Sequence, residues 1–319
     1  MRFAIVIPAF NCEAYIAETI YSAIGQAHGD LEVVVVDDGS TDHSLAEAQA
    51  IKDPRLRIIS QENSGVMVAR KVGFEACRAN AVVFLDGDDR LRPDAITRYQ
   101  QLFKARPQVG LLYGDRILID HDGRSYGSRR GALLNPCPNG QVLRQLLTRN
   151  FISTIGQTCI RAECLEHSTA LRLDLRRAAD WVLYCEIAAS HEFFYIGGEP
   201  VTEYRILPNS MARRLATAGN HTTDIEEVMP AIREIYAMPG VVNCFTPEEL
   251  TRLRQTTEAS AFAWKGQELL RSRQWRAARS CFLKAMRHSQ CIDPRDLLCL
   301  ALTYLRAFPP GSRRYIGLP

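Results

Sequence analysis

Hydrophobic positions along residues 1–110 follow two alternating periods. Short runs of mostly β-branched residues are each followed by a stretch in which apolar side chains recur every three or four positions. This pattern predicts strands over Phe3–Ile7, Glu32–Val36, Leu56–Ser60 and Ala81–Leu85, with helices between them. Strands that alternate with helices are typical of a mostly parallel sheet with helices on its faces. The expected fold class is therefore α/β.

A polar loop follows three of these predicted strands. The loops read Pro8-Ala9-Phe10-Asn11, Asp37-Asp38-Gly39-Ser40 and Asp86-Gly87-Asp88-Asp89. Pro8 is expected to end the first strand, because proline has no N–H to donate to a sheet. Open α/β sheets bind ligands beyond the carboxyl ends of their strands, so we expect the three loops to converge on one site.

The strand pattern weakens in the second half of the chain. A strand pair is expected within Val109–Ile119, and a helix within Leu171–Ala189. Beyond residue 220 helices dominate, and Thr246-Pro247-Glu248-Glu249 has the cap, proline and acidic residues of a helix start. We expect one domain over residues 1–220 and a helical region over residues 221–319.

The helical region contains one hairpin with a repeat-like spacing of small and aromatic residues. It spans Ala259–Ser289, and its spacing is similar to that of a tetratricopeptide repeat. The positions concerned are Phe262, Gly266, Leu269, Ala278, Phe282 and Ala285. An ordinary helical hairpin that packs on the first domain explains the same spacing, because a single repeat cannot bury its own faces.

Composition excludes several classes of protein. The chain has 319 residues, of which 46% are hydrophobic and 24% charged, which excludes disordered and collagen-like classes. No apolar run approaches the ~18 residues of a membrane span. The first residues run directly into a strand pattern without a leader-like segment, so a cytoplasmic location is expected. The net charge of +3 predicts no nucleic-acid partner.

Positive charge is concentrated in the last part of the chain. Residues 251–319 contain 13 Lys and Arg but 4 Asp and Glu. The final predicted helix, which starts at Asp293-Pro294, is apolar nearly all round, and this favours burial. The alternative is that this helix, with Arg313 and Arg314 beyond it, makes a peripheral contact with an anionic membrane.

The segment Asp86-Gly87-Asp88-Asp89 is the strongest chemical signal in the sequence. Three carboxylates within four residues repel one another unless solvent or a cation relieves them. Oxygen ligands of this kind suit Mg²⁺ or Mn²⁺, which commonly share their sites with substrate phosphates. The alternative is a solvated acidic turn before the helix that starts near Pro93.

These motifs together resemble the inverting family 2 glycosyltransferases with the GT-A fold. The resemblance covers residues 3–93 and rests on four segments, which are Val6–Asn11, Val36–Asp42, Asn63–Gly65 with Ala69-Arg70, and Phe84–Asp89. Further on, Asp180-Trp181-Val182-Leu183-Tyr184 and Tyr204-Arg205 are similar to two later motifs of the family. The resemblance implies a nucleotide-binding half over residues 1–110 and an acceptor half over residues 111–220.

The resemblance also implies a role for each matching residue. Nucleotide-sugar binding is implied for Pro8, Ala9, Asn11, Asp38, Arg70, Asp86, Gly87, Tyr204 and Arg205. Asp88, together with Asp86, is implied to hold Mn²⁺ or Mg²⁺ against the diphosphate of the donor, where a dication stabilises the charge of the leaving group. Trp181 is a candidate for acceptor binding, because its ring could stack on a sugar.

Asp180 is the candidate catalytic base. Inversion at the sugar carbon needs a group that takes the proton from the attacking hydroxyl of the acceptor. The alternative role of Asp180 is to cap a helix. The sequence departs from the family pattern at two places, because Ala179 replaces an acidic residue and no histidine follows Arg205 in Ile206-Leu207-Pro208.

The implied function is metal-dependent, inverting transfer of a sugar from a nucleoside diphosphate sugar, with uracil or thymine favoured as the base. The implied acceptor is a glycan or a lipid-linked glycan in bacterial surface polysaccharide synthesis. One alternative is a catalytically degenerate binding or scaffold protein. Another is a sugar-phosphate nucleotidyltransferase, although Ile7–Asn11 lacks the glycine and lysine of a phosphate-binding loop.

Overall fold

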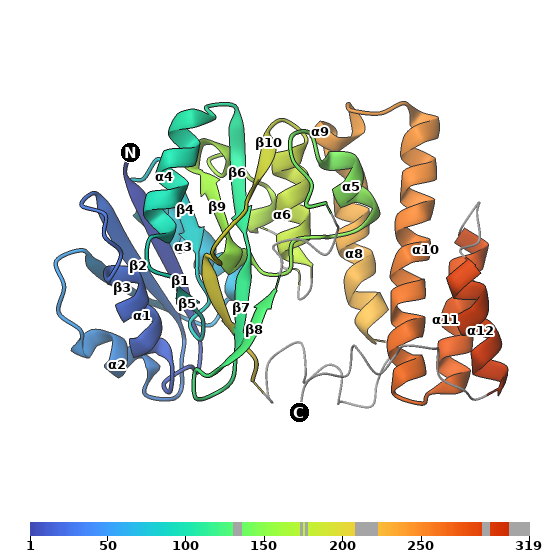
Figure 1. Cartoon of the computed structure of the whole chain (residues 1–319), viewed down its shortest axis with the longest axis horizontal. Coiled ribbons are helices and arrows are strands. Elements are labelled where there is room, and N and C mark those ends of the chain that lie inside the picture. Colours follow the sequence, from blue (N-terminus) through green and yellow to red (C-terminus); the bar gives the residue numbers. More distant parts are fainter. Residues whose placement is uncertain (130–135, 173–174, 176–177, 208–222, 289–293, 306–319) are drawn as a thin grey trace. The chain divides into compact units, whose positions relative to one another are not determined.

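The computed structural model describes residues 1–129, 136–172, 175, 178–207, 223–288 and 294–305 (Figure 1). The strands are β1 (Phe3–Ala9), β2 (Leu31–Asp38), β3 (Leu56–Gln61), β4 (Ala81–Phe84), β5 (Arg90–Leu91), β6 (Val109–Gly114), β7 (Arg116–Ile119), β8 (Ser125–Arg129), β9 (Thr158–Arg161), β10 (Glu192–Ile196) and β11 (Thr202–Arg205). The helices are α1 (Ile16–Ile24), α2 (Ser44–Ala50), α3 (Val66–Ala76), α4 (Ala95–Ala105), α5 (Leu143–Thr148), α6 (Ala179–Ala188), α8 (Thr223–Ala237), α9 (Pro239–Val242), α10 (Pro247–Arg271), α11 (Trp275–His288) and α12 (Pro294–Leu305). Short 3-10 helices cover Ile155–Gln157, Ala162–Cys164 and Ala170–Arg172.

The chain divides into two compact units. The first comprises residues 1–146 and 150–210, and the second comprises residues 147–149 and 211–319. The domain boundary expected at residue 220 falls within 208–222, outside the described residues. Every site discussed below lies within one unit.

A seven-stranded sheet forms the centre of the first unit, in the order β10-β6-β9-β4-β1-β2-β3. Strands β4, β1, β2 and β3 run parallel to one another, and β9 is antiparallel to both β4 and β6. The first unit is therefore the α/β fold with a mostly parallel sheet that the strand and helix periods predict.

Alternating residues of the central strands pack on opposite faces of this sheet. On one face Ile5 and Val33 join a core cluster with Ile20 of α1 and Tyr99 of α4. On the other face Val34 and Val36 pack with Ala69 of α3. The four-residue runs of valine and isoleucine thus reflect strands that are covered by helices on both faces.

Strand β1 is two residues longer than the sequence predicts, because it continues through Pro8 to Ala9. The backbone N–H of Leu85 donates to the Val6 carbonyl at 3.0 Å, so Val6 faces β4, and by the two-residue period Pro8 faces the same side. Strand β4 ends opposite Val6. No carbonyl of β4 therefore lies opposite Pro8, so the N–H that Pro8 lacks costs the sheet no hydrogen bond.

A second, smaller sheet contains four strands in the order β5-β11-β7-β8. The strand pair expected within Val109–Ile119 is wrong as a pair, because β6 belongs to the large sheet and β7 to the small one. Asp115 separates the two strands, and the backbone N–H of Val201 donates to its carbonyl at 2.9 Å. The chain thus changes sheets at this residue.

The second unit is helical in its described residues. Helix α10 starts as predicted, with a capping box in which Thr246 accepts from the N–H of Glu249 and the Glu249 carboxylate accepts from the N–H of Thr246. Helix α11 follows a turn over residues 272–274, and Gly266 of α10 packs closely on the ring of Phe282. None of the described helices has the length and apolar character that a membrane crossing requires.

Candidate functional site

The loops after β1 and β2 are joined by hydrogen bonds at Asn11. Its backbone N–H donates to Ser40 Oγ at 3.1 Å, and its side-chain oxygen accepts from the N–H of Thr41 at 2.8 Å. Asn11 has a φ of 50°, a left-handed conformation that asparagine tolerates better than most residues. The polar loops of two strands therefore converge as predicted, and Asn11 is the residue that links them.

The carboxylate of Asp38 is buried and is held by its own chain. Oδ1 accepts from Gln61 Nε2 at 2.7 Å and from the N–H of Ser64 at 2.9 Å, and Oδ2 accepts from the N–H of Gly65 at 2.9 Å. Asp38 thereby fixes the turn that leads into α3. The short Asn-Ser-Gly segment of the sequence is the loop that this carboxylate organises.

Gly87 lies against the loop after β1. A Cβ at this position would be 2.9 Å from Cys12 Sγ, 3.2 Å from the Pro8 carbonyl oxygen and 3.5 Å from Ala9 Cα. The contact with Cys12 Sγ would be a clash and that with the Pro8 carbonyl would be tight, so glycine at position 87 lets the Asp86–Asp89 loop approach the end of β1 this closely. Pro8 and Ala9 are buried in this contact.

Thr19 of α1 holds the acidic loop, Asp86–Asp89, by hydrogen bonds to its backbone. Its hydroxyl lies within hydrogen-bonding distance of the carbonyl oxygens of Asp89, at 2.7 Å, and of Gly87, at 3.0 Å. Sequence reasoning missed Thr19, although a signal exists. This polar residue falls on the buried stripe of α1, between Ile16 and Ile20.

Arg70, on α3, forms an ion pair with Asp86. Its Nη2 is 2.7 Å from Asp86 Oδ1, and the arginine side chain is 8% exposed. Asp180, at the start of α6, lies close enough to Arg70 and Asp86 for both charges to affect its pKa. Burial raises the pKa of Asp180, the positive charge of Arg70 lowers it, and the carboxylate of Asp86 raises it. The structure thus brings together the three predicted residues Arg70, Asp86 and Asp180.

Asp88 and Asp89 are both unfavourable places for negative charge. Burial, followed by the charge of Asp86, raises the pKa of Asp88 to about 6. Asp89 is fully buried, and burial together with the charges of Asp88 and Asp86 raises its pKa well above the usual range. Its Oδ1 accepts from the N–H of Arg205 at 2.9 Å, while its Oδ2 is buried and has no hydrogen-bond partner among the described residues.

The acidic loop fits the divalent cation that the sequence predicts. Asp88 and Asp86 carry carboxylate oxygens, the hard ligands that such an ion prefers, and burial together with the charge of Asp86 raises the pKa of Asp88. Arg70 compensates one oxygen of Asp86. A bound Mn²⁺ or Mg²⁺ would supply the missing positive charge at Asp88.

Arg205 is buried, and its guanidinium is used within the protein. Nε donates to the Asp88 carbonyl at 2.8 Å, Nη1 donates to the carbonyls of Asp120 and His121 at 3.0 and 3.1 Å, and Nη2 pairs with Glu18 at 2.5 Å. The arginine side chain is 1% exposed. Arg205 therefore ties the acidic loop to the β7–β8 turn and to α1.

This arrangement differs from the nucleotide contact that the resemblance implies for Arg205. Every nitrogen of its guanidinium already has a protein acceptor, so the structure favours a positioning role. Nothing in the sequence marks Glu18 as its partner, because an acidic residue on an amphipathic helix normally lies in solvent. Tyr204 is half-buried near the acidic loop, where burial and the charges of Asp89, Asp86 and Asp88 raise its pKa.

Trp181 is a core residue rather than an exposed platform. It is 7% exposed, and its indole Nε1 donates to the Leu146 carbonyl at 2.7 Å. A sugar ring stacks on an open aromatic face, which Trp181 does not offer. The structure therefore gives Trp181 a packing role in place of the expected acceptor contact.

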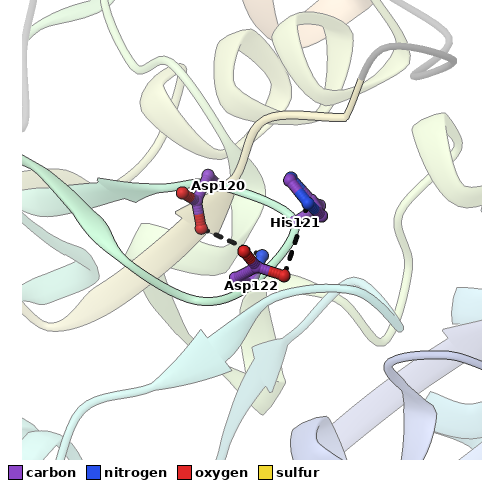
Figure 2. A group of neighbouring side chains, drawn as sticks. All are labelled: Asp120, His121 and Asp122. Atoms are coloured by element: carbon purple, nitrogen blue, oxygen red, sulfur yellow. Dashed lines mark hydrogen bonds and ion pairs between the residues drawn. The ribbon is translucent and has the colours of Figure 1, made fainter.

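Asp120, His121 and Asp122 cluster in the β7–β8 turn (Figure 2). Asp120 Oδ1 accepts from the N–H groups of Asp122 and Arg124, and His121 Nε2 is 3.3 Å from Asp122 Oδ1. These local hydrogen bonds explain the cluster as a polar turn. Its carbonyls at 120 and 121 accept from Arg205, which is its connection to the acidic loop.

Comparison with known proteins gives one family match. The model of the family described as Glycosyl transferase family 2 matches residues 4–167, which is more than half of the chain. Curated relatives include the chondroitin synthase of Escherichia coli, 38% identical over 122 residues, and the hyaluronan synthase of Pasteurella multocida, 34% identical over 122 residues. Each match covers 38% of this chain, but it covers 18% of the first relative and 13% of the second.

Solved structures resemble nearly the whole chain in fold. A structure of S. aureus TarS residues 1–349 with UDP-GlcNAc has a TM-score of 0.66 at 15% identity, and the match covers 96% of this chain and 88% of that one. The mannosyltransferase PcManGT of Pyrobaculum calidifontis, with GDP-Man and Mn²⁺, has a TM-score of 0.57 at 17% identity, with coverage of 98% and 82%. The α/β fold with a helical C-terminal region is therefore shared with these proteins.

Proposed function

Because this chain belongs to glycosyl transferase family 2, we propose that it transfers a sugar from a nucleoside diphosphate sugar to an acceptor hydroxyl with inversion. The observation that carries this proposal is the grouping of Arg70, Asp86 and Asp180 around one ion pair, which unites loops from β4, α3 and α6. The proposed donor-binding residues Arg70 and Asp86 then lie next to Asp180, the carboxylate proposed to remove the proton.

Asp180 is the proposed general base. A carboxylate becomes a stronger base when its pKa rises, and burial raises the pKa of Asp180. The positive charge of Arg70 opposes that rise in the pKa of Asp180. The group that usually precedes this residue in the family is acidic, and here Ala179 is buried instead, so Arg70 and Asp86 are the charges that tune the base.

Asp88 and Asp86 are proposed to hold Mn²⁺ or Mg²⁺. When bound, the ion neutralises charge on the departing nucleoside diphosphate. The protein's part is to present the two carboxylates together, through the glycine at position 87, the hydroxyl of Thr19 and the guanidinium of Arg205. Removal of the ion by a chelator should abolish transfer, and added Mn²⁺ should restore it.

The donor is proposed to carry a uracil or thymine base near Asp38. These bases have one ring N–H, which a carboxylate oxygen can accept. The acceptor is proposed to be a glycan or a lipid-linked glycan, consistent with the polysaccharide synthases among the relatives. The setting we propose is bacterial surface polysaccharide synthesis.

The test is the variant Asp180→Asn, compared with Glu248→Gln at an exposed helix start in the second unit. We expect Asp180→Asn to bind UDP and UDP-sugars with unchanged Kd in titration calorimetry, and to lower kcat by ~10²–10⁴. Glu248→Gln should change neither. Equal loss of donor binding and turnover in Asp180→Asn would show a structural role and overturn the assignment of the base. Absence of nucleotide binding in the wild-type protein would instead indicate a degenerate fold.

A further inference from the structure

Helix α12, in the second unit, exposes an apolar face. Leu297, Leu298 and Tyr304 are 43%, 49% and 61% exposed, and Ala301 is exposed between them. The spacing of these four residues places them on one side of the helix. The opposite side carries Cys299, Leu302 and Thr303, which are buried. The expected burial of this helix is therefore correct for one side and wrong for the other.

Helix α11 places a basic stripe beside this face. The Arg279 guanidinium lies 3.6 Å from the ring centroid of Tyr304, and its Nη2 donates to the Thr303 carbonyl at 3.1 Å. Arg276, Leu283 and Arg287 lie on the same side of α11 as Arg279, at steps of three or four residues. All three are exposed, and Leu283 is 39% exposed. The stripe that contacts Tyr304 thus continues along α11.

A shallow hollow lies at the start of this stripe. It is lined by Arg273, Arg276 and Arg279, with Trp275 and Gln274. Arg273 and Arg276 are exposed, and their guanidinium groups suit the oxygens of a phosphate, which they can bind in pairs. The hollow thus adds a further arginine, Arg273, to those of the stripe beside the exposed apolar side chains of α12.

We propose that these helices form a docking face for a membrane surface that contains anionic phospholipids. The docking face is defined as Arg276, Arg279, Leu283 and Arg287 of α11 with Leu297, Leu298, Ala301 and Tyr304 of α12. Neither residues 275–288 nor residues 297–304 contain Asp or Glu. Apolar side chains flanked by arginine are what a segment lying in the headgroup region needs.

A lipid surface fits this face better than a second copy of the chain. Two copies that met through the docking face would bring the arginines of each α11 close to those of the other, and like charges at an interface oppose association. Anionic headgroups instead attract each arginine near the surface. This proposal concerns the second unit alone and does not depend on the proposed reaction.

The experiment measures binding of the full chain to vesicles by flotation. One set of vesicles is phosphatidylcholine alone, and the other contains phosphatidylglycerol in addition. We expect binding to the second set that is much stronger than to the first and that weakens as salt is raised, because salt screens the attraction. Equal binding to both sets, or none to either, would overturn the proposal.

Paired variants identify the face. Arg276→Glu with Arg287→Glu should lower the partition coefficient by about 30-fold or more, the factor expected for two cationic contacts. The matched control, Arg233→Glu with Arg252→Glu, makes the same charge change at exposed arginines of α8 and α10 and should bind at least tenfold better than the test pair. Equal loss in both pairs would show general charge attraction and contradict a defined face.

The apolar part has its own variant. Leu297→Gln with Leu298→Gln should weaken vesicle binding without changing the melting temperature, because both side chains are exposed. Sedimentation of the lipid-free protein gives the competing outcome. If the wild-type chain is a dimer and this variant is a monomer, then the face joins two copies, and the membrane proposal is wrong.

Discussion

Replacement of Arg205 by lysine would separate two roles for this residue. One role is a contact with the donor, as the family resemblance implies, and the other is the internal link from the acidic loop to the β7–β8 turn and Glu18. Lysine keeps the positive charge but concentrates its donors on one atom. It can therefore pair with Glu18, but it cannot also reach the carbonyls of Asp88, Asp120 and His121.

The size of the effect follows from those carbonyls. A carbonyl that loses its donor costs about 1–3 kcal/mol when it is fully buried. These contacts are only partly buried, so the loss of two of them should cost about 2–4 kcal/mol in the free energy of unfolding. Domains of this kind are stable by roughly 5–15 kcal/mol, so the variant should still fold. Arg92→Lys is the control, because Arg92 is 38% exposed in its pair with Glu203 and should cost less than about 1 kcal/mol.

Urea unfolding of the ligand-free protein is the assay. Arg205→Lys should lower the midpoint at an unchanged slope, while Arg92→Lys should leave the midpoint nearly unchanged. Binding of Mn²⁺ should also weaken in Arg205→Lys, because the backbone of Asp88 loses a contact. If the variant unfolds like the wild type and only the KM for the donor rises, then Arg205 contacts the donor and the reasoning is refuted.

Two further predictions concern Asp88 and Trp181. Folding raises the pKa of Asp88 from 3.8 to about 6, so the folded protein binds this proton more tightly and becomes less stable as pH rises through that window. Asp88→Asn should therefore raise the free energy of unfolding of the metal-free protein at pH 7 by up to about 3 kcal/mol, and by much less at pH 4. Urea unfolding at the two pH values is the measurement. Because Asp88 must be ionised to hold the metal, we also expect the affinity for Mn²⁺ to fall below about pH 6. Trp181→Phe removes the hydrogen bond to the Leu146 carbonyl and should cost about 1–2 kcal/mol in thermal unfolding with an unchanged KM for the acceptor, whereas a raised KM would restore the acceptor role.

The sequence predicts the large sheet well because its signal is local. Runs such as Val33–Val36 read as buried strands, and the carboxyl ends of parallel strands must meet at one edge of the sheet. The linkage of Asn11 to the loop after β2 follows from that rule. The extra residues of β1 do not, because they depend on where the neighbouring strand β4 ends.

The direction of charged side chains was not predictable. Arg205 and Glu18 are 187 positions apart, and neither has a neighbour in sequence that reveals the other. An arginine on an amphipathic helix normally lies in solvent, but Arg70 is buried and paired with Asp86. The same limit applies to α12, where a sequence that is apolar nearly all round does not say which side is covered. In each case the missing information is which distant segment lies alongside.

If Asp38 contacts the donor base as proposed, its own hydrogen bonds limit the kind of base that it can accept. A carboxylate has about four lone-pair positions, and Gln61, Ser64 and Gly65 use three of them. One acceptor position remains, which matches the single imide proton of a pyrimidine such as uracil. Guanine presents two adjacent donors and would have to displace one of the N–H groups at the start of α3. Under the proposed contact, discrimination between the two bases would follow from the hydrogen bonds that already hold Asp38 in its turn, with no side chain beyond Asp38 itself.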